Sequence, residues 1–312
     1  MDNQVPVLLV VFNRPEKTRR VIEALRQVKP ARLFVAADGP RPGRPDDIEK
    51  CRLARQAASE IHWPCDVKTR FLDENVGCDP SVSAAIHWFF EHVEQGVILE
   101  DDCVLHPDYF RFCDEMFARY ADDARIMQVS SFAPYPDRHH PYDYHFSRTF
   151  RCGGGWGTWR RAWALYSDSL ERYDNDIDQM LKAYFPSSAK YAERKKLYER
   201  FRLGKRDNWD YKWNFACYAQ NSLCIVPEKN LMTNIGFDEE GTHTTKASPM
   251  FSQLRTEPLE FPLRHPPFVF ADGRPERSLE KGIYRSLPLK SRYAWRLRHA
   301  LGAMKDFWQT QP

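Results

Sequence analysis

Short apolar runs alternate with helix-patterned stretches along the first hundred residues of the chain. Residues 5–12 form a continuous apolar run, a pattern typical of a strand covered on both faces, and RLFVAA at 32–37 predicts a second strand. Between them, Pro15 opens a stretch in which apolar residues recur on one side of a helix up to about Val28. The alternation continues with a helix over 46–59, a strand at 65–72, a helix over 81–92 and a strand at 97–99. This order predicts an α/β domain with a mainly parallel sheet and helices on both faces.

The second half of the chain has a less regular pattern. It predicts, in chain order, a helix over 107–119, a strand at 125–132, helical segments near 160–168, 187–203 and 208–220, and a short strand at 222–231. A polar loop over 234–245 follows this last strand. The sequence has no internal repeat and no low-complexity region.

Composition narrows the class of protein. The net charge of +3 over 312 residues is too small to indicate a nucleic-acid partner. The eight cysteines form no CxxC pair and have no histidine at zinc-site spacing, so we expect reduced thiols. The polar start MDNQ does not resemble a signal peptide, and no apolar stretch has the length of a membrane span. We therefore expect a cytoplasmic protein.

The C-terminal segment differs in kind from the rest. Between Arg277 and Trp308 there are eight Lys and Arg residues against Glu280 and Asp306. Apolar residues recur there at helical spacing: Leu289, Tyr293, Leu297, Leu301, Met304 and Trp308. Such a basic amphipathic tail suits a helix lying on an anionic membrane surface, which would place the protein peripherally on the inner membrane face. A C-terminal helix docked on the body, with its basic side in water, fits the pattern equally well.

Three acids, Glu100, Asp101 and Asp102, follow directly on the apolar run 97–99. Adjacent carboxylates repel one another and resist leaving water, so their place at the end of a buried strand needs a reason. A hard divalent cation, Mg²⁺ or Mn²⁺, held together with substrate phosphates would supply one. Ligands of such sheets collect at the carboxyl ends of the strands. The alternative is a solvated turn whose acids cap the next helix.

The stretch VILEDDCVLHPDYFRF, residues 97–112, resembles the metal-binding segment of inverting GT-A glycosyltransferases. It is most similar to the N-acetylglucosaminyltransferase I group and to bacterial family-2-like glycosyltransferases. The resemblance extends in consistent order through most of residues 5–245. VPVLLVVFNRPEKTRRVIEAL resembles the family's first strand and helix, and LFVAADGP resembles its second strand. The resemblance implies a GT-A fold, which is Rossmann-like, and a nucleotide-sugar donor.

The same resemblance implies roles for residues expected at the carboxyl edge of the sheet. Asp102 would be the direct ligand of Mn²⁺ or Mg²⁺, while Glu100 and Asp101 would shape the donor-sugar and ribose side of the site. Arg14 would meet a donor phosphate, and Asp38 would meet the uracil edge. Two plainer alternatives stay open: Arg14 as a surface residue, and Asp38 as a turn former in Asp-Gly-Pro.

GGGWGTWRRAW, residues 153–163, resembles the family's Gly-rich, Trp-containing turn that leads into a helix beside the donor sugar. Gly155 would allow close backbone approach, and the Trp156 indole would offer an apolar face to the sugar ring. The alternative is a tight turn with core tryptophans.

DNWDYKWNF, residues 207–215, resembles the family's Trp-Asp motif, whose Asp is the catalytic base. Asp210 matches that position. The sequence departs from the motif in the two residues that follow, so Asp207 is the second candidate for the base. The alternative for Asp210 is an ordinary helix acid. His243, in the loop over 234–245, would close over the diphosphate as a further metal ligand, or be a solvated loop residue.

These features lead to one functional hypothesis and two alternatives. The hypothesis is a metal-dependent glycosyltransferase, a hexosyl- or N-acetylhexosaminyl-transferase, that moves a sugar from a nucleotide-diphosphate sugar to an acceptor hydroxyl with inversion. The donor is expected to be UDP-linked, and the acceptor to be a glycan or lipid-linked molecule in cell-surface glycan or lipopolysaccharide assembly. The alternatives are a non-catalytic carbohydrate-binding or scaffold protein on this fold, and a sugar-phosphate nucleotidyltransferase. FNRPEKTRR lacks the Gly-rich loop usual in the latter.

Three regions follow from this hypothesis. Residues 1–105 would form the nucleotide-sugar half of a GT-A domain, and residues 106–250 its acceptor and catalytic half. Residues 251–312 would form an extended segment and the basic tail.

Overall fold

The computed structural model describes residues 4–134, 141–152, 154–204, 208–236, 254–275 and 277. These residues fall into two compact units. The first consists of the described residues of 1–134, 140–165 and 223–272. The second consists of those of 166–222 and 273–277. The divisions expected at residues 105 and 250 stay predictions.

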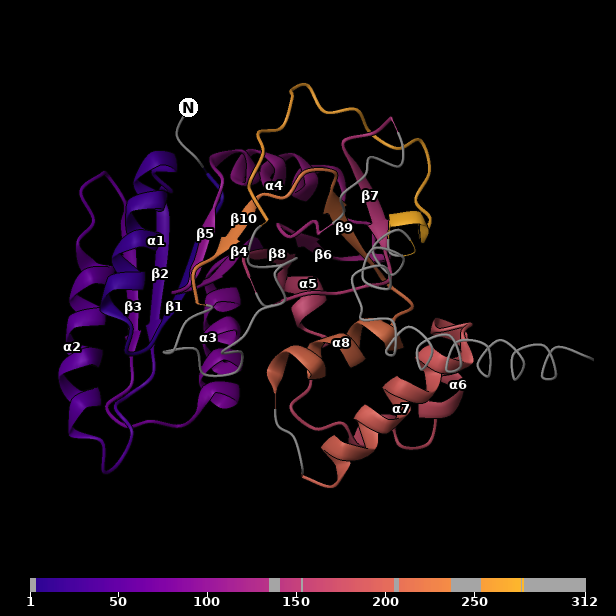
Figure 1. Cartoon of the computed structure of the whole chain (residues 1–312), viewed down its shortest axis with the longest axis horizontal. Helices are drawn as coiled ribbons and strands as arrows, with labels where there is room; N and C mark the ends of the chain where they lie inside the picture. Colours follow the sequence, from indigo (N-terminus) through magenta and orange to yellow (C-terminus); the bar gives the residue numbers. More distant parts are fainter. Residues whose placement is uncertain are drawn as a thin grey trace, which may run out of the picture. The chain divides into compact units, whose positions relative to one another are not determined.

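The first unit is built on a mixed, mainly parallel sheet (Figure 1). Within the described residues this sheet has eight strands, in the spatial order β3-β2-β1-β4-β8-β6-β9-β7. Their bounds are β1 Val7–Val11, β2 Arg32–Ala37, β3 Asp66–Phe71, β4 Gln95–Glu100, β6 Ile126–Ser130, β7 Tyr144–Ser147, β8 Trp156–Trp159 and β9 Leu223–Pro227. β3, β2, β1 and β4 pair in parallel, as do β6 and β9, whereas β8 and β7 run antiparallel to their neighbours. The predicted α/β class with a mainly parallel sheet is confirmed.

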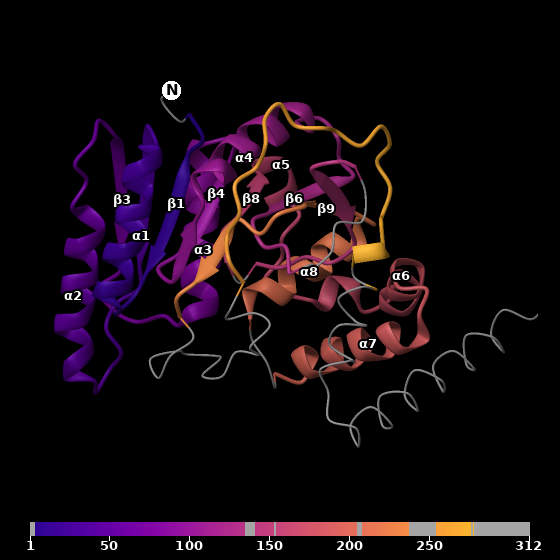
Figure 2. The same cartoon turned by 45° about the horizontal axis from the view of Figure 1, so that its top comes forward.

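Helices cover both faces of this sheet (Figure 2). On one face, α1 (Pro15–Val28) packs against α2 (Pro45–Ser59) and α4 (Pro107–Arg119). On the other, α3 (Cys78–His92) packs against β1, β2 and α5 (Arg160–Trp163). The alternation of side chains in β2 separates the two faces. Leu33 and Val35 belong to the core cluster on the α1 side, whereas Phe34 packs on Phe89 of α3, with ring centroids 5.0 Å apart.

Strand β8 corrects the expectation of a Gly-rich turn over 153–163. Residues 156–159 form a strand between β4 and β6, and only the short helix α5 follows it. The glycines here serve close packing. A β-carbon at Gly157 would lie 2.8 Å from Phe117 Cζ, and one at Gly155 would lie 2.6 Å from Leu105 Cδ2. Glycine therefore lets this strand approach α4 and β5 (Cys103–Leu105) closely.

The second unit is helical in its described residues. It contains a short 3₁₀ turn, Glu171–Tyr173, and the helices α6 (Ile177–Tyr184), α7 (Ser188–Arg202) and α8 (Trp209–Ala219). Aromatic contacts join these helices. Tyr184 of α6 meets Tyr218 of α8 at 4.8 Å, and Tyr198 of α7 meets Phe215 of α8 at 5.5 Å, between ring centroids. α6 was not predicted, because its eight residues fall between stronger helical patterns.

None of the helices in the described part of the chain has the length and apolar character that crossing a membrane requires.

Candidate functional site

The acid turn, Glu100-Asp101-Asp102, connects the end of β4 with β5. Val10 of β1 pairs with Glu100, so the residues that follow β1 run beside the acid turn at the carboxyl edge of the sheet. The side chain of Asp101 is 2% exposed, and that of Asp102 is 14% exposed. Two adjacent carboxylates are therefore largely withdrawn from water, and both need compensating partners.

Arg14 supplies the positive charge. Its Nη2 donates to Asp101 Oδ1, and its Nη1 donates to Asp102 Oδ2 at 3.0 Å. The backbone amide of Phe12 also reaches Asp101, at 3.4 Å from Oδ2. The structure thus brings together three residues that the sequence proposed for one site, and Arg14 is a bridging residue of that site rather than a surface residue.

Burial and charge act in opposite directions on the pKa values of these groups. Burial raises the pKa of Asp101 above its ordinary value, although the charge of Arg14 opposes this effect. Burial acts to lower the pKa of Arg14, but the charges of Asp101 and Asp102 raise it overall. The guanidinium accordingly stays charged at every working pH.

Asp102 has further contacts on its other side. Its Oδ1 accepts a hydrogen bond from the Cys103 thiol at 3.1 Å, and its backbone oxygen accepts one from Ile235 N at 2.8 Å. A β-carbon at Gly236 would overlap Asp102 Oδ2. The chain that leaves β10 (Met232–Asn234) therefore crosses the acid turn closely. Sequence analysis missed this contact, because only the pairing of β10 with β5 brings Gly236 there.

Asp38 directly follows β2 and holds a neighbouring loop closed. Its Oδ1 accepts hydrogen bonds from the backbone amides of Gly39 and Val76, at 2.8 and 3.0 Å. Its Oδ2 accepts from Asn75 Nδ2 and Gly77 N, at 2.9 and 3.1 Å. This carboxylate is buried and has four donors, three of them in the loop over 75–77, which it holds in place. The contact with a uracil edge stays a prediction.

Asp47 is a third buried acid at this edge, after Asp101 and Asp38, and sequence analysis missed it. It lies in the first turn of α2 and accepts hydrogen bonds from Asn13 Nδ2 at 2.8 Å and Arg41 Nη2 at 2.9 Å. The hydrogen bond from Arg41 lowers the pKa of Asp47 well below its ordinary value. Asp47 thereby ties the loop before α2 to the residue beside Arg14. The sequence feature that could have indicated Asp47 is Pro-Asp-Asp at a helix start. This feature predicts an exposed helix cap as readily as a buried acid.

Trp156 is a core residue in this structure. It is 1% exposed, and its ring centroid lies 6.3 Å from that of Trp163. The backbone oxygen of Gly155 accepts a hydrogen bond from Ser131 Oγ. These positions match the alternative of core tryptophans, and the contact of Trp156 with a donor sugar stays a prediction.

Asp210 lies in the first turn of α8, half-buried, in the second unit. Arg14, Asp38 and the acid turn lie in the first unit. Asp207, His243 and the basic C-terminal tail lie outside the described residues. The roles expected for them stay predictions.

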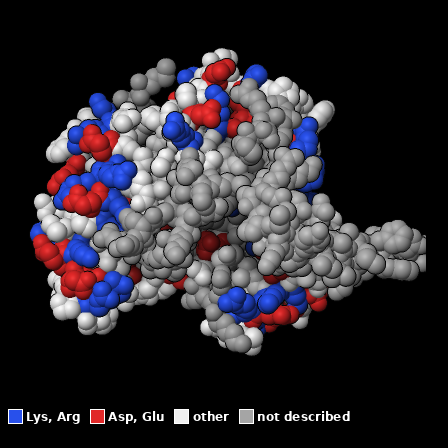
Figure 3. All heavy atoms as spheres, in the orientation of Figure 1, with Lys and Arg blue, Asp and Glu red and all other residues white. Residues whose placement is uncertain are grey.

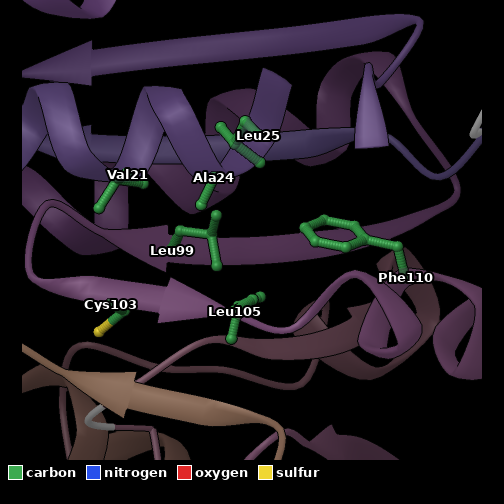
Figure 4. Close-up of a pocket in the computed structure, with 7 residues that line it drawn as sticks. All are labelled: Val21, Ala24, Leu25, Leu99, Cys103, Leu105 and Phe110. Carbon is green, nitrogen blue, oxygen red and sulfur yellow. The ribbon is translucent and has the colours of Figure 1, made fainter. Parts of the chain in front are cut away.

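An apolar pocket lies next to the acid turn (Figure 4). Val21 of α1, Leu99 of β4 and Phe110 of α4 are among the residues that line it. Cys103, whose thiol contacts Asp102, also lines it. The described lining consists of apolar side chains and this thiol, so the pocket offers nothing to a phosphate or a sugar. Leu99 and Cys103, the neighbours of the acid turn in sequence, are both buried.

The surface charges of the described residues are mixed in sign (Figure 3). Several exposed cations pair with acids on their own helix, among them Arg19 with Glu16 and Arg52 with Glu49. Such exposed pairs add little to stability. Red and blue atoms are interspersed on the face shown, which agrees with the small net charge.

The described residues offer no ready-made metal site. Among them, no group of three or more His, Cys, Asp or Glu side chains is arranged to hold an ion. Mg²⁺ and Mn²⁺ need several oxygen ligands, and in the acid turn the Arg14 guanidinium already bridges the two carboxylates. As arranged, these residues do not fit a resident divalent ion.

Comparison with known proteins leaves the family open. No protein-family model matches the chain, and no curated protein matches it either. Among solved structures, the chain is similar to mouse xyloside xylosyltransferase 1 in its apo form. The sequence identity is 14%, the match covers 68% of this chain and 80% of that chain, and the TM-score is 0.35. A score this low assigns the chain to no family.

Proposed function

We propose that this chain is a GT-A glycosyltransferase that transfers a sugar from a nucleoside-diphosphate sugar to an acceptor hydroxyl. The observation that best supports this function is the position of the acid turn. It follows β4 beside Arg14 after β1, and Asp38 follows β2, so all three lie at one carboxyl edge. Parallel α/β sheets bind nucleotides at this edge. The resemblance of residues 97–112 to a GT-A motif supplies the reaction class.

The proposed donor-binding roles follow from the chemistry of the side chains. The planar guanidinium of Arg14 can offer two parallel hydrogen bonds to a phosphate. Asp38 fixes the loop over 75–77, against which the base of the nucleotide, proposed to be uracil, would lie. Glu100 and Asp101 would accept hydrogen bonds from ribose and sugar hydroxyls.

The transfer step needs one base. The acceptor oxygen attacks the anomeric carbon, the bond from that carbon to the diphosphate oxygen breaks, and the acceptor proton passes to a carboxylate. We propose that Asp210 is the base that accepts this proton, with Asp207 as the second candidate. A single displacement of this kind inverts the anomeric centre.

Mn²⁺ or Mg²⁺ enters this proposal only as an expectation from the resemblance. When bound, such an ion would compensate charge on the leaving diphosphate. Asp102, and His243 as a further ligand, are the residues that the resemblance implies. We assign no step to the ion, because Arg14 holds the carboxylate of Asp102 in this structure.

The acceptor is proposed to be a glycan or a lipid-linked molecule used in cell-surface glycan or lipopolysaccharide assembly. The basic segment after Arg277 supports this, because a cationic amphipathic tail would bring the protein to an anionic membrane surface.

Donor screening tests the function. The full chain is incubated with UDP-, GDP- and CMP-linked sugars, with Mn²⁺ or with EDTA, and products are identified by mass spectrometry. We expect sugar release or transfer from a UDP-sugar, supported by Mn²⁺. A raised melting temperature with UDP but no turnover would instead support the scaffold alternative. Synthesis of a nucleotide sugar from a sugar phosphate would support nucleotidyl transfer, and no binding of any nucleotide would refute the proposal.

A further inference from the structure

Arg14 occupies the carboxylate oxygens that a divalent ion would need. Its two terminal nitrogens contact Asp101 Oδ1 and Asp102 Oδ2, and the second oxygen of Asp102 accepts from the Cys103 thiol. A guanidinium and a metal ion compete for the same lone pairs and repel each other. The metal ion that the resemblance implies on Asp102 therefore disagrees with the contacts that Asp102 has.

We infer that Arg14 is the resident cation of the acid turn, and that a divalent ion can reach Asp102 only when the guanidinium leaves it. This inference concerns the regulation of the site in the proposed function and rests on that function for its biological meaning. The competition itself requires no nucleotide. It makes the chain, as folded, a weak binder of Mn²⁺ alone.

The attachment of Arg14 suits such an exchange. Its backbone oxygen accepts hydrogen bonds from Thr18 N at 3.0 Å and Thr18 Oγ1 at 2.9 Å, and Pro15 follows it at the start of α1. The backbone is thus fixed, while the long side chain holds the acids through its terminal nitrogens. An anion such as a diphosphate can take over this planar fork without moving the helix.

Charge explains why departure of the Arg14 guanidinium would favour another cation at the acid turn. The two carboxylates that Arg14 contacts (−2) and its guanidinium (+1) leave a formal charge of −1. When a diphosphate draws Arg14 away, Asp101 and Asp102 are left buried without a cation, which is costly. Departure of Arg14 therefore leaves buried carboxylate charge that another cation would compensate.

Mn²⁺ binding without nucleotide tests the competition. The full chain is titrated with Mn²⁺ at neutral pH, and the bound ion is measured by electron paramagnetic resonance and calorimetry. In Arg14→Gln we expect Mn²⁺ to bind about tenfold or more tightly than in wild type, because a charge-assisted competitor is gone. Arg19→Gln removes the same charge from an exposed site on α1 and should leave the Kd unchanged. Arg14→Gln combined with Asp102→Asn should lose the gain.

Equal Mn²⁺ affinity in wild type and Arg14→Gln would overturn the inference, as would a gain that survives Asp102→Asn. If Arg14→Gln fails to fold, as judged by circular dichroism, Arg14→Lys carries the test. Its single ammonium cannot bridge both acids, so an intermediate gain is expected, and no gain overturns the inference. UDP is titrated separately into wild type. Failure of UDP to bind refutes the proposed function but leaves the Mn²⁺ result standing.

Discussion

Asp38, Asp47 and Asp101 are three buried aspartates at one sheet edge, and each has at least one partner in a segment distant in sequence. Asp101 is neutralised by Arg14, Asp47 by Arg41, and Asp38 by backbone and amide donors. Sequence analysis located Asp38 and Asp101, each after a predicted strand, but missed Asp47 at the start of a predicted helix. The partners of all three were not predicted, because hydrophobic spacing predicts elements and not which loops meet.

Substitution of Asp47 tests the ion pair that ties two loops together. Asp47→Asn should lower the free energy of unfolding by about 2 kcal/mol, because a buried charged acceptor of Arg41 is lost. The matched control is Asp46→Asn, which removes the same charge from the exposed neighbouring position and should cost less than about 0.5 kcal/mol. Urea unfolding at pH 7 measures both.

The same pair predicts a pH dependence. The hydrogen bond from Arg41 lowers the pKa of Asp47 in the folded state, so the unfolded chain takes up this proton first as pH falls. The stabilisation is present above about pH 5 and declines as pH drops below about 4, the ordinary value for Asp. The gap between wild type and Asp47→Asn should therefore narrow at pH 3. A gap of constant size would contradict this assignment.

Gly236 offers a test of the contact that crosses the acid turn. In Gly236→Ala the added β-carbon overlaps the Asp102 carboxylate, so we expect a loss of about 1–3 kcal/mol in unfolding free energy. In an Asp102→Ala background the same change should cost at least about 0.5 kcal/mol less, because the clashing group is gone. Strictly additive effects in this double-mutant cycle would mean that the two residues do not touch.

At the scale of elements, burial decided which patterns could be recognised. β1 is covered on both faces and appears as a continuous apolar run, β2 is apolar and buried after Arg32, and α4 spans the predicted 107–119. β8 was not recognised, because Gly155 and Gly157 suggest a turn. In the structure these glycines leave room for the side chains of Leu105 and Phe117, respectively. β5, β7 and β10 (three or four residues each) are too short to show a period of two.

Trp156 distinguishes a core strand from a sugar platform. Trp156→Ala should lower the free energy of unfolding by about 3–5 kcal/mol, because it leaves a large cavity between the sheet and α5. Phe268→Ala serves as the control, since that ring is 71% exposed and should cost less than about 0.5 kcal/mol. Unchanged stability in Trp156→Ala, measured in urea, would show that this indole does not belong to the core.

At the scale of the whole molecule, the chain divides its expected chemistry between two units. The acid turn and Arg14 lie in the first, and Asp210 lies in the second. Each unit has its own core: alternating strand residues in the first, and aromatic rings in tilted and edge-on contact in the second. The order of motifs along the sequence predicted a site shared by both, but hydrophobic patterns contain nothing about how separate cores are placed.

Two variants separate binding from turnover in the proposed reaction. Asp210→Asn should leave the Kd for a UDP-sugar unchanged and lower turnover by about 10²–10⁴-fold, because only the proton acceptor is removed. Asp102→Asn should weaken nucleotide binding that depends on Mn²⁺. Calorimetry and product assays measure the two effects. Normal turnover in Asp210→Asn would transfer the assignment to Asp207.

The hydrogen bonds that the Asp38 carboxylate accepts have a consequence for the exchange of amide hydrogens with solvent. Val76 is 50% exposed, and a loop amide at such a position ordinarily trades its proton with water within seconds or faster. Here the amides of Val76 and Gly77 are held by a buried carboxylate. We expect deuterium uptake at these two amides to be slow in wild type and fast in Asp38→Ala, followed by NMR or mass spectrometry. The amides of a surface loop would then exchange their hydrogens slowly, as the amides of a sheet do.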